Sequence, residues 1–329
     1  TDINVAENNN YYSSSAGLLF DKNKTELIKY PAGKSLKNFN IPNGVKSLDG
    51  YSFCNCSNLT SINIPESVTY IGIGAFYLCT NLKSIAIPDS VTKIENITFT
   101  GCSSLTSISI PESVTYIGLD AFKDCTSLTS IYIPDSVTLT GLSGTFSGCT
   151  SLTNVKLPDV IYIISTNTFA GCSSLLNIII PDSVTSIKEC AFEGCKSLTN
   201  IAIPESVTKI KTWAFKDCTS LKSIAINNPD CEISNAKDTI PETAVIYGYK
   251  NSTAQTYAES FNRKFISLEE IGDISGNGEI DLYDAIEIAK AIMGLRTFTA
   301  EEMIIADFNK DGTVDLYDAI EIARTLLPK

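Results

Sequence analysis

A period of 23 residues runs through most of this chain and constrains its fold more than any other feature. Prolines recur at positions 42, 65, 88, 111, 134, 158, 181 and 204, with a single step of 24 residues. Phenylalanines keep the same spacing at positions 53, 76, 99, 122, 146, 169, 192 and 215, and a cysteine follows each by three residues. A unit this short cannot bury its own apolar face, so successive units must stack on one another. The period therefore predicts a solenoid.

The pattern inside one unit predicts how each coil is built. The unit of residues 105–125 begins with Leu-x-x-Ile-x-Ile (residues 105–110), in which the inward apolar residues of a short strand alternate with polar ones. Pro111 ends this strand because proline cannot donate to a ladder. Residues 113–117 predict a second short extended segment, and Phe122 is expected to be buried at the turn of the coil.

The repeat also predicts the length and the interior of the solenoid. Nine strand starts, from Leu36 to Leu221, predict a right-handed coil roughly 40 Å long at about 4.8 Å per rung. The periodic cysteines should form an internal column of small buried apolar groups, because a redox or metal role needs exposed, convergent ligands. Disulfides between rungs are an alternative that would break the equivalence of the units. Cys54, Cys190 and Cys231 lie outside the period.

The net charge of −12 is concentrated at one end of the chain. Residues 269–329 contain 14 acidic and 5 basic residues, whereas residues 1–268 contain 23 and 20. A segment this acidic repels itself unless cations bind, and it lacks the basic stripe that nucleic-acid binding requires. The chain has no apolar run of about 18 residues, so no membrane span is predicted. It also starts without the basic and apolar regions of a signal peptide, so we expect any such peptide to have been removed.

The composition argues against catalysis. Histidine is absent, which removes the commonest general base and every Ser-His or Cys-His nucleophile. A glycosidase with paired carboxylates is the enzyme class left open. However, most acids of the repeat occupy one equivalent position after the proline, which favours a solvated surface: Glu66, Asp89, Glu112, Asp135, Asp182 and Glu205. We therefore predict no catalytic residues and no enzymatic activity.

Two twelve-residue segments, 273–284 and 307–318, have the spacing of calcium-binding loops. Ca²⁺ takes about six to eight oxygens, which a tight loop supplies from positions 1, 3, 5, 7, 9 and 12, with glycine at position 6. Both segments have glycine at position 6, Gly278 and Gly312. The expected ligands of two Ca²⁺ ions are Asp273, Ser275, Asn277, Glu279, Asp281 and Asp284 in the first loop, and Asp307, Asn309, Asp311, Thr313, Asp315 and Asp318 in the second.

A helix is expected after each loop, over residues 282–293 and 316–327, because apolar residues recur there at helical spacing. Position 12 is aspartate rather than the bidentate glutamate of a calmodulin-type loop, and no ordinary helix precedes the first loop at residues 269–272. The predicted order is therefore loop then helix, twice, without a leading helix. Residues 281–290 and 315–324 differ only in their last residue, which is lysine in the first and arginine in the second.

The repeat resembles the BspA-like leucine-rich repeats of bacterial surface and secreted proteins. The resemblance covers roughly residues 10–265 and rests on the recurring Ile-Pro-x-Ser-Val-Thr-x-Ile. Residues 17–33 look like a variant first unit, and residues 246–258 look like the C-terminal cap, with Ser252 as the N-cap of its helix. Because this family is mostly regarded as adhesion or protein-interaction modules, the resemblance implies such a role here.

Residues 272–327 resemble a dockerin domain, which implies a cohesin module of a scaffoldin as partner. The family's partner contacts lie at loop positions 10 and 11 and on the outer face of the helix. Carried over to this chain, they are Leu282, Tyr283, Ala289, Lys290, Leu316, Tyr317, Ala323 and Arg324. A core role for Leu282 and Leu316 is the alternative, whereas exposed Tyr283 and Tyr317 would suit interface anchors. The near-identity of the two halves predicts binding in two orientations related by a half-turn.

The sequence thus predicts a leucine-rich-repeat solenoid, mainly β with short helical or irregular turns, followed by a small all-α calcium-binding dockerin domain. The expected divisions are an N-terminal variant repeat at 1–35, 23-residue units at 36–226, a C-terminal cap at 227–268 and the dockerin at 269–329. Only residues 267–272 join the cap to the first loop, so a restricted range of orientations is expected. The resemblances imply a secreted component of an extracellular, cellulosome-type assembly of an anaerobic bacterium, free or attached to the cell surface through a scaffold.

The ligand of the solenoid is the least constrained expectation. Outward residues on its strand face are mostly small and polar, but Tyr132, Lys156 and Ile179 occupy equivalent positions on adjacent rungs and should form a row. This row is either a ligand anchor or neutral surface variation. A protein ligand is favoured over plant-wall polysaccharide, because polysaccharide sites usually need aromatic platforms and only Tyr132 offers one on this face.

Overall fold

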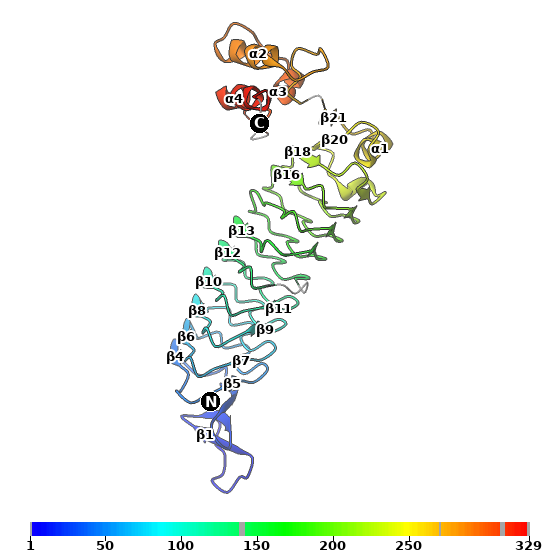
Figure 1. Ribbon diagram of the computed structural model, residues 1–329. Helices are drawn as coiled ribbons and strands as arrows, with labels where there is room; N and C mark the ends of the chain where they lie inside the picture. Colours follow the sequence, from blue (N-terminus) through cyan, green and yellow to red (C-terminus); the bar gives the residue numbers. More distant parts are fainter. Residues whose placement is uncertain (1, 138–141, 270, 310–312, 328–329) are drawn as a thin grey trace.

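Two ladders of short parallel strands run along an elongated solenoid (Figure 1). The computed structural model describes residues 2–137, 142–269, 271–309 and 313–327. The first ladder contains β4 (Asn38–Asn40), β6 (Ser61–Asn63), β8 (Ser84–Ala86), β10 (Ser107–Ser109), β12 (Ser130–Tyr132), β13 (Asn154–Lys156), β16 (Asn200–Ile203), β18 (Ser223–Ile226), β20 (Val245–Gly248) and β21 (Phe265–Ser267). The second contains β5 (Ser47–Leu48), β7 (Tyr70–Ile71), β9 (Lys93–Ile94), β11 (Tyr116–Ile117), β14 (Ile163–Ile164), β15 (Ser186–Ile187), β17 (Lys209–Ile210) and β19 (Glu232–Ile233).

Equivalent residues of successive units pair with one another, which confirms the predicted solenoid. Ile85 of β8 lies opposite Ile62 of β6 on one side and Ile108 of β10 on the other, and all three are buried. In the first ladder, each strand from β4 to β16 ends one or two residues before the proline of its unit, as expected from the missing N–H. Three consecutive antiparallel strands precede the units: β1 (Tyr12–Ser15), β2 (Leu18–Asp21) and β3 (Glu26–Lys29).

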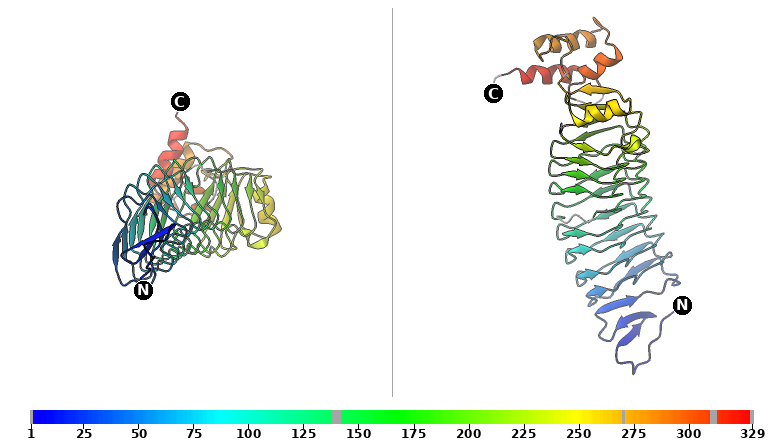
Figure 2. Two further views of the ribbon diagram at one scale, coloured as in Figure 1. Left: turned by 90° about the horizontal axis from the view of Figure 1, so that it is seen from below. Right: turned by 90° about the vertical axis from the view of Figure 1, so that its right-hand side faces the viewer.

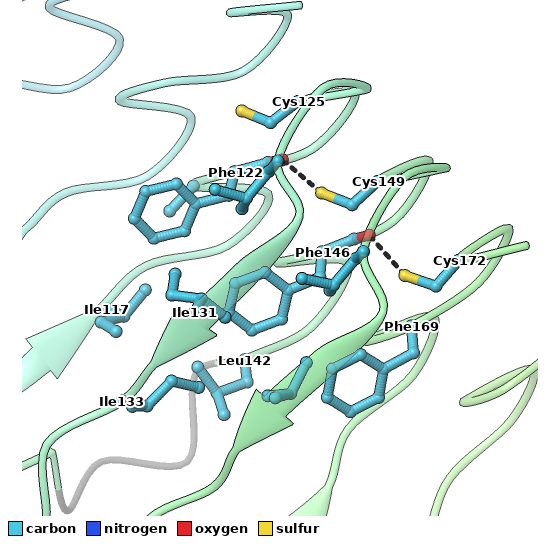
Figure 3. Packing of buried hydrophobic residues seen from close by; sticks show 14 of the residues in the cluster. Ile117, Phe122, Cys125, Ile131, Ile133, Leu142, Phe146, Cys149, Phe169 and Cys172 are labelled. Carbon is cyan, nitrogen blue, oxygen red and sulfur yellow. Dashed lines mark hydrogen bonds between the residues drawn. The ribbon is translucent and has the colours of Figure 1, made fainter. Parts of the chain in front are cut away.

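The periodic phenylalanines form a continuous stack inside the solenoid. All eight are fully buried, and neighbouring ring centroids from Phe53 to Phe215 lie between 5.3 Å and 5.7 Å apart. Figure 3 shows three of these rings, Phe122, Phe146 and Phe169, in successive coils. Aromatic packing of this kind adds to the area that each ring buries. The stack is the structural reason for the invariant spacing of this residue.

The periodic cysteines form the expected buried column, and each thiol also bonds between coils. The Sγ of Cys149 donates to the carbonyl oxygen of Phe122 (3.1 Å), and Cys172 donates to that of Phe146 (3.1 Å), as Figure 3 shows. All eleven cysteines lie in the described part of the chain and are free thiols. Burial raises the pKa of Cys102 to about 12, so this thiol stays neutral at physiological pH. The column therefore adds a second hydrogen bond, from the next coil, to carbonyls that already accept an N–H of their own coil, as Phe122 O does from Cys125 N.

One of the nine expected strands does not form. Residues 175–180 lie between β13 and β16 but adopt no strand, although they begin with the same Leu-x-x-Ile-x-Ile pattern. In several other units a threonine directly precedes the strand, and its hydroxyl donates to a carbonyl of the preceding coil, as in Thr129 and Thr153. Leu176 occupies this position in the irregular rung and has no hydroxyl to donate. The missing hydroxyl does not by itself account for the irregular rung, because Lys83 and Lys222 occupy the same position and β8 and β18 still follow them.

A column of serines ties the coils together on the side of the second ladder. Ser136 Oγ donates to Val114 O (2.7 Å) and Ser183 Oγ donates to Ile161 O (2.7 Å). The same bond recurs at four other units, formed by Ser67, Ser90, Ser113 and Ser206. Val160 replaces the serine in the unit between Ser136 and Ser183, so the column is interrupted there.

Restoring this column should stabilise the protein. We expect Val160→Ser to raise the free energy of unfolding by about 0.5–1 kcal/mol, because the new hydroxyl can donate to Val137 O as its equivalents do. The matched variant Ser136→Val removes an existing bond and should lower the free energy of unfolding by a similar amount. Denaturant unfolding of both variants measures the two effects, and a destabilising Val160→Ser would contradict the assignment.

The C-terminal cap of the solenoid combines two strands with a short helix. Ser252 is the N-cap of α1 (Thr253–Ser260), as predicted, and its Oγ accepts from Gln255 N (3.2 Å). The hydroxyl of Tyr257 donates to Ala236 O (2.9 Å), just before the 3₁₀ helix η1 (Lys237–Thr239). The buried side chains of α1 therefore close the end of the core that the repeats leave open.

Three helices follow the cap at the C-terminal end of the solenoid (Figures 1 and 2). Both expected helices form, α2 (Leu282–Ile292) and α4 (Leu316–Thr325), and each ends one or two residues early. The expectation that neither loop has a leading helix is wrong for the second loop, because α3 (Ala300–Ala306) precedes it directly. The capping box of Thr299 and Glu302 begins this helix. Within the described ranges, no helix combines the length and the apolarity that crossing a bilayer demands.

Candidate functional site

The first candidate calcium loop is held in shape by its own first carboxylate. Asp273 accepts hydrogen bonds from the main-chain N–H groups of Asn277 (3.0 Å) and Gly278 (2.8 Å), which curl the loop around it. Gly278 has a φ of +90°. This is the left-handed turn that the glycine at position 6 supplies. The oxygen-bearing side chains at positions 1, 3 and 5 therefore lie on one tight turn.

The last residue of each loop is a buried carboxylate that joins the loop to its helix. Asp284 is fully buried, and its two oxygens accept from Ser275 N (2.9 Å) and Asp281 N (2.7 Å). Asp318 repeats the arrangement, accepting from Asn309 N (3.0 Å) and Asp315 N (2.9 Å). No basic side chain forms an ion pair with Asp284 or Asp318 within the described ranges. Since a buried carboxylate needs a compensating charge, both positions fit a cation.

The donor set suits calcium rather than a softer metal. Within the described residues, no three carboxylates, thiolates or imidazoles converge, so a cation here depends on hydroxyl, amide and main-chain oxygens as well. Such all-oxygen sets are typical of Ca²⁺. Asn277 Nδ2 donates to Asp281 Oδ2 (3.1 Å), a bond that a bound cation would replace. In the second loop Asp307, Asn309, Thr313, Asp315 and Asp318 are described, whereas Asp311 and Gly312 lie outside the described residues.

The residues expected to contact a partner lie mostly on the surface. Tyr283 and Tyr317 are 70% and 68% exposed, and Leu282 and Leu316 are also more than half exposed. The alternative in which these two leucines belong to the core is therefore wrong. Lys290 and Arg324 are exposed as well, whereas Ala289 and Ala323 are half-buried. The two halves present near-identical exposed patches, because residues 281–290 and 315–324, which begin at the N-caps of α2 and α4, are identical at nine of ten positions.

An ion-pair network distinguishes the first half from the second, and the sequence pattern does not reveal it. Glu287 on α2 accepts from Lys290 (2.7 Å) and from Arg296. Arg296 also forms an ion pair with Glu302 at the start of α3 (2.6 Å), and its guanidinium lies over the ring of Phe298. Lys290 and Arg296 hold the pKa of Glu287 below its usual range. The equivalent Glu321 forms no ion pair in the part of the chain that the structure describes.

This network predicts a small, pH-dependent difference in the free energy of unfolding between the matched variants Glu287→Gln and Glu321→Gln. Because the folded pKa of Glu287 is lowered, its ion pairs stabilise the fold above the ordinary glutamate pKa and are lost as the pH falls through the lowered value. With saturating calcium at pH 7, Glu287→Gln should lower the free energy of unfolding by less than about 1 kcal/mol. Glu321→Gln should leave it unchanged. Equal effects of the two variants in thermal unfolding would contradict the network.

The expected row on the solenoid is only partly regular. Tyr132 pairs with Lys156 across β12 and β13, so these two side chains lie side by side. Lys156 Nζ binds Asp159 (2.6 Å) and lies 3.8 Å from Asp135. Ile179 sits on the rung that forms no strand and is 86% exposed.

The fold and the loops together define a leucine-rich-repeat solenoid joined to a dockerin. Residues 30–143 and 140–237 match the family described as BspA type leucine rich repeat region, and the chain belongs to this family. Residues 271–327 match the dockerin type I domain, a family that binds calcium. Both are families of non-catalytic modules. No curated protein matches the chain.

Solved structures with similar folds include leucine-rich-repeat proteins from two bacteria. One from Bacteroides ovatus shares 28% identity, covers 78% of this chain and 75% of its own, and has a TM-score of 0.58. One from Eubacterium ventriosum shares 32% identity over 66% of this chain and 52% of its own, with a TM-score of 0.44. The first of these supports the solenoid fold.

Proposed function

We propose that this chain is a non-catalytic secreted protein that docks through a calcium-dependent dockerin onto a cohesin of a cellulosome-type scaffold. The observation that carries the proposal is the pair of near-identical exposed patches, each beginning at positions 10 and 11 of a candidate calcium loop. Tyrosines at such exposed helix starts are typical interface anchors. The solenoid is then the part that the scaffold displays, in an extracellular, polysaccharide-degrading assembly of an anaerobic bacterium.

Two Ca²⁺ ions are proposed, one in each loop. The segment from residue 269 onward has nine more acidic than basic residues. Two calcium ions would offset four of these negative charges. The proposed ligands are the six positions of each loop that the sequence predicts, with Glu279 and Thr313 binding through their main-chain carbonyls. The same hydrogen bonds to Asp284 and Asp318 in the two loops support equivalent sites.

The cohesin is proposed to bind either patch, in orientations related by a half-turn. Leu282, Tyr283 and Lys290 form the core of one patch, and Leu316, Tyr317 and Arg324 form that of the other. The half-buried Ala289 and Ala323 lie between these residues on the same helices and allow close approach. The matching exposures of the two tyrosine–leucine pairs support this dual mode.

The solenoid is proposed to bind a protein, with Tyr132, Lys156 and Ile179 as the ligand face. Plant-wall polysaccharide is the second candidate ligand. An aromatic pair does lie elsewhere on the solenoid, where Tyr51 and Tyr77 have ring centroids 6.2 Å apart. Their planes meet at 77°, so the two rings do not form one coplanar platform for a sugar ring. This geometry favours the protein ligand.

The domain divisions follow from the same proposal. We assign residues 1–35 to the N-terminal variant repeat, 36–226 to the units, 227–268 to the cap and 269–329 to the dockerin. The buried side chains of the described helical region form a cluster of their own, distinct from the core of the solenoid. Separate cores support separate folding units.

A pull-down with the intact, calcium-loaded protein tests the proposal. We expect retention on immobilised cohesin modules and on a fraction of secreted proteins, and no retention on insoluble plant-wall polysaccharides. Adding soluble cohesin should release the protein from the cohesin resin only. Retention on polysaccharide that survives saturation with cohesin would instead support the second candidate ligand for the solenoid.

A further inference from the structure

The outward row of the first ladder is exposed along the solenoid and becomes covered at its C-terminal end. From Asn40 to Ala202 each residue of this row is exposed, and the isoleucine in it, Ile179, is 86% exposed. The strand register continues the row through Ala225 and Tyr247 to Ile266 on β21. Ile266 is only 4% exposed, and Tyr247 is half-buried. A part of the molecule outside the row therefore covers its last rungs.

Neither core of the protein accounts for this burial. Ile266 belongs neither to the buried cluster of the solenoid nor to that of the helical region, and the same holds for the buried Ile271. β21 ends the ladder within the described residues, so the ladder gives Ile266 a neighbour on one side alone, Tyr247. Buried apolar side chains outside both cores are typical of a contact between two domains. Ile266 and Ile271 therefore lie where the solenoid meets the helices.

The segment that joins the two parts is hydrogen-bonded to both of them. Leu268 N donates to Gly248 O (2.7 Å), just beyond the end of β21. Gly272 N donates to Ile305 O (2.8 Å) in α3. Figure 2 shows the helices seated directly on the cap end of the solenoid. These bonds hold α3 close to the end of the outward row.

The second candidate calcium loop begins beside this contact. Burial and then the nearby carboxylate of Asp307, position 1 of the loop, raise the pKa of the Tyr247 hydroxyl to about 12. The ring of the next residue, Phe308, lies so close to Gly272 that a Cβ there would meet it at 2.7 Å. The first two residues of the loop are thus placed by the joint and by the outward row.

We propose that the end of the outward row supports the second calcium loop, with Tyr247 and Ile266 as positioning residues. Calcium binding at this loop and contact with the solenoid then favour each other by the same factor, because coupling between two equilibria is reciprocal. The calcium-loaded protein consequently holds its solenoid in one fixed orientation relative to the docking patches. The inference rests on the proposed calcium sites and is independent of the identity of the cohesin.

Competition with a chromophoric calcium chelator, on the intact chain, tests this support. The double variant Tyr247→Ser/Ile266→Ser places the small residue type of Ser109 on the last rungs. Neither side chain belongs to the solenoid core, so the main thermal transition should not fall. One of the two calcium sites should weaken by about fivefold or more, and the other should keep its affinity. Tyr247→Phe keeps the ring that covers the row and should bind calcium as the wild type does.

Small-angle X-ray scattering in saturating calcium measures the orientation directly. The wild type should fit a single rigid arrangement, whereas Tyr247→Ser/Ile266→Ser should show a spread of arrangements while its helical circular dichroism is retained. Ala202→Ser, on the exposed part of the same row, should change neither measurement. Unaltered calcium affinity or unaltered scattering in the double variant would overturn the support, and cohesin binding in calcium would still stand. A wild type that binds no calcium would overturn the proposed calcium sites as well.

Discussion

Chelation of calcium should unfold α2, α3 and α4 while leaving the solenoid folded. The described core of this helical region contains only six buried apolar side chains, with a few others packed against it. A region this small and acidic lacks the apolar burial needed to fold alone, so cation binding supplies much of its folding free energy. At free calcium about a thousandfold above the dissociation constant, each site contributes about 4 kcal/mol.

Circular dichroism of the intact chain measures this effect. α1 is the one α-helix of the described solenoid and has eight residues, so the helical signal arises mostly from α2, α3 and α4. EDTA should remove that signal and leave the β-sheet signal and the main thermal transition unchanged. Asp273→Asn with Asp307→Asn should mimic EDTA, and the charge-matched Asp182→Asn on the solenoid should not. A helical signal that survives EDTA would rule out calcium-dependent folding.

Substitution of both docking patches should abolish cohesin binding, whereas substitution of either one alone should have little effect. If two equivalent orientations are available, removal of one costs RT ln 2, about 0.4 kcal/mol. Leu282→Ala/Tyr283→Ala should therefore weaken binding about twofold, as should Leu316→Ala/Tyr317→Ala. All four substitutions together should cost about 4 kcal/mol or more, roughly a thousandfold, because anchor residues are then missing in both orientations.

Titration calorimetry with one cohesin module checks these values. Because the four side chains are exposed, the variants should keep the helical signal of the wild type in calcium. A matched control is Tyr162→Ala, which removes an exposed tyrosine from the solenoid. If Leu282→Ala/Tyr283→Ala alone abolished binding, the two orientations would not be equivalent. Arg296 forms an ion pair with Glu287 beside the first patch, and the equivalent Glu321 has none among the described residues. This would then be the first structural difference to test.

Most of the solenoid could be predicted because each unit must bury the same apolar positions against its neighbours. Phe122, Cys125 and Ile108 are buried, and so are the residues at the equivalent positions of the other units. The spacing of these positions therefore identifies the rungs and the inward face. The two candidate calcium loops can also be located from the sequence, since the spacing of the expected ligands is set by local backbone geometry. Asp284 and Asp318, at position 12, accept a hydrogen bond from the main-chain N–H of position 3 of their own loops. Their placement therefore also depends on local backbone geometry.

The features that the sequence did not reveal depend on contacts between units. Residues 175–180 keep the strand pattern but form no strand, and no side chain of this rung alone explains the difference. The helix α3 is seven residues long and buries Ala306. This is too short for its apolar residues to show a clear helical period in the sequence. Arg296 joins Glu287 and Glu302 across a loop, at a separation that no helical or strand periodicity marks.

Calcium titration of the intact protein in the presence of a panel of cohesin modules tests the central claim most directly. Helical circular dichroism and cohesin binding should rise together over the same range of calcium concentration. At least one cohesin should bind in calcium, and EDTA should release it fully. Cohesin binding that persists in EDTA, or helices that form in calcium without binding any cohesin, would contradict the proposed calcium-dependent docking.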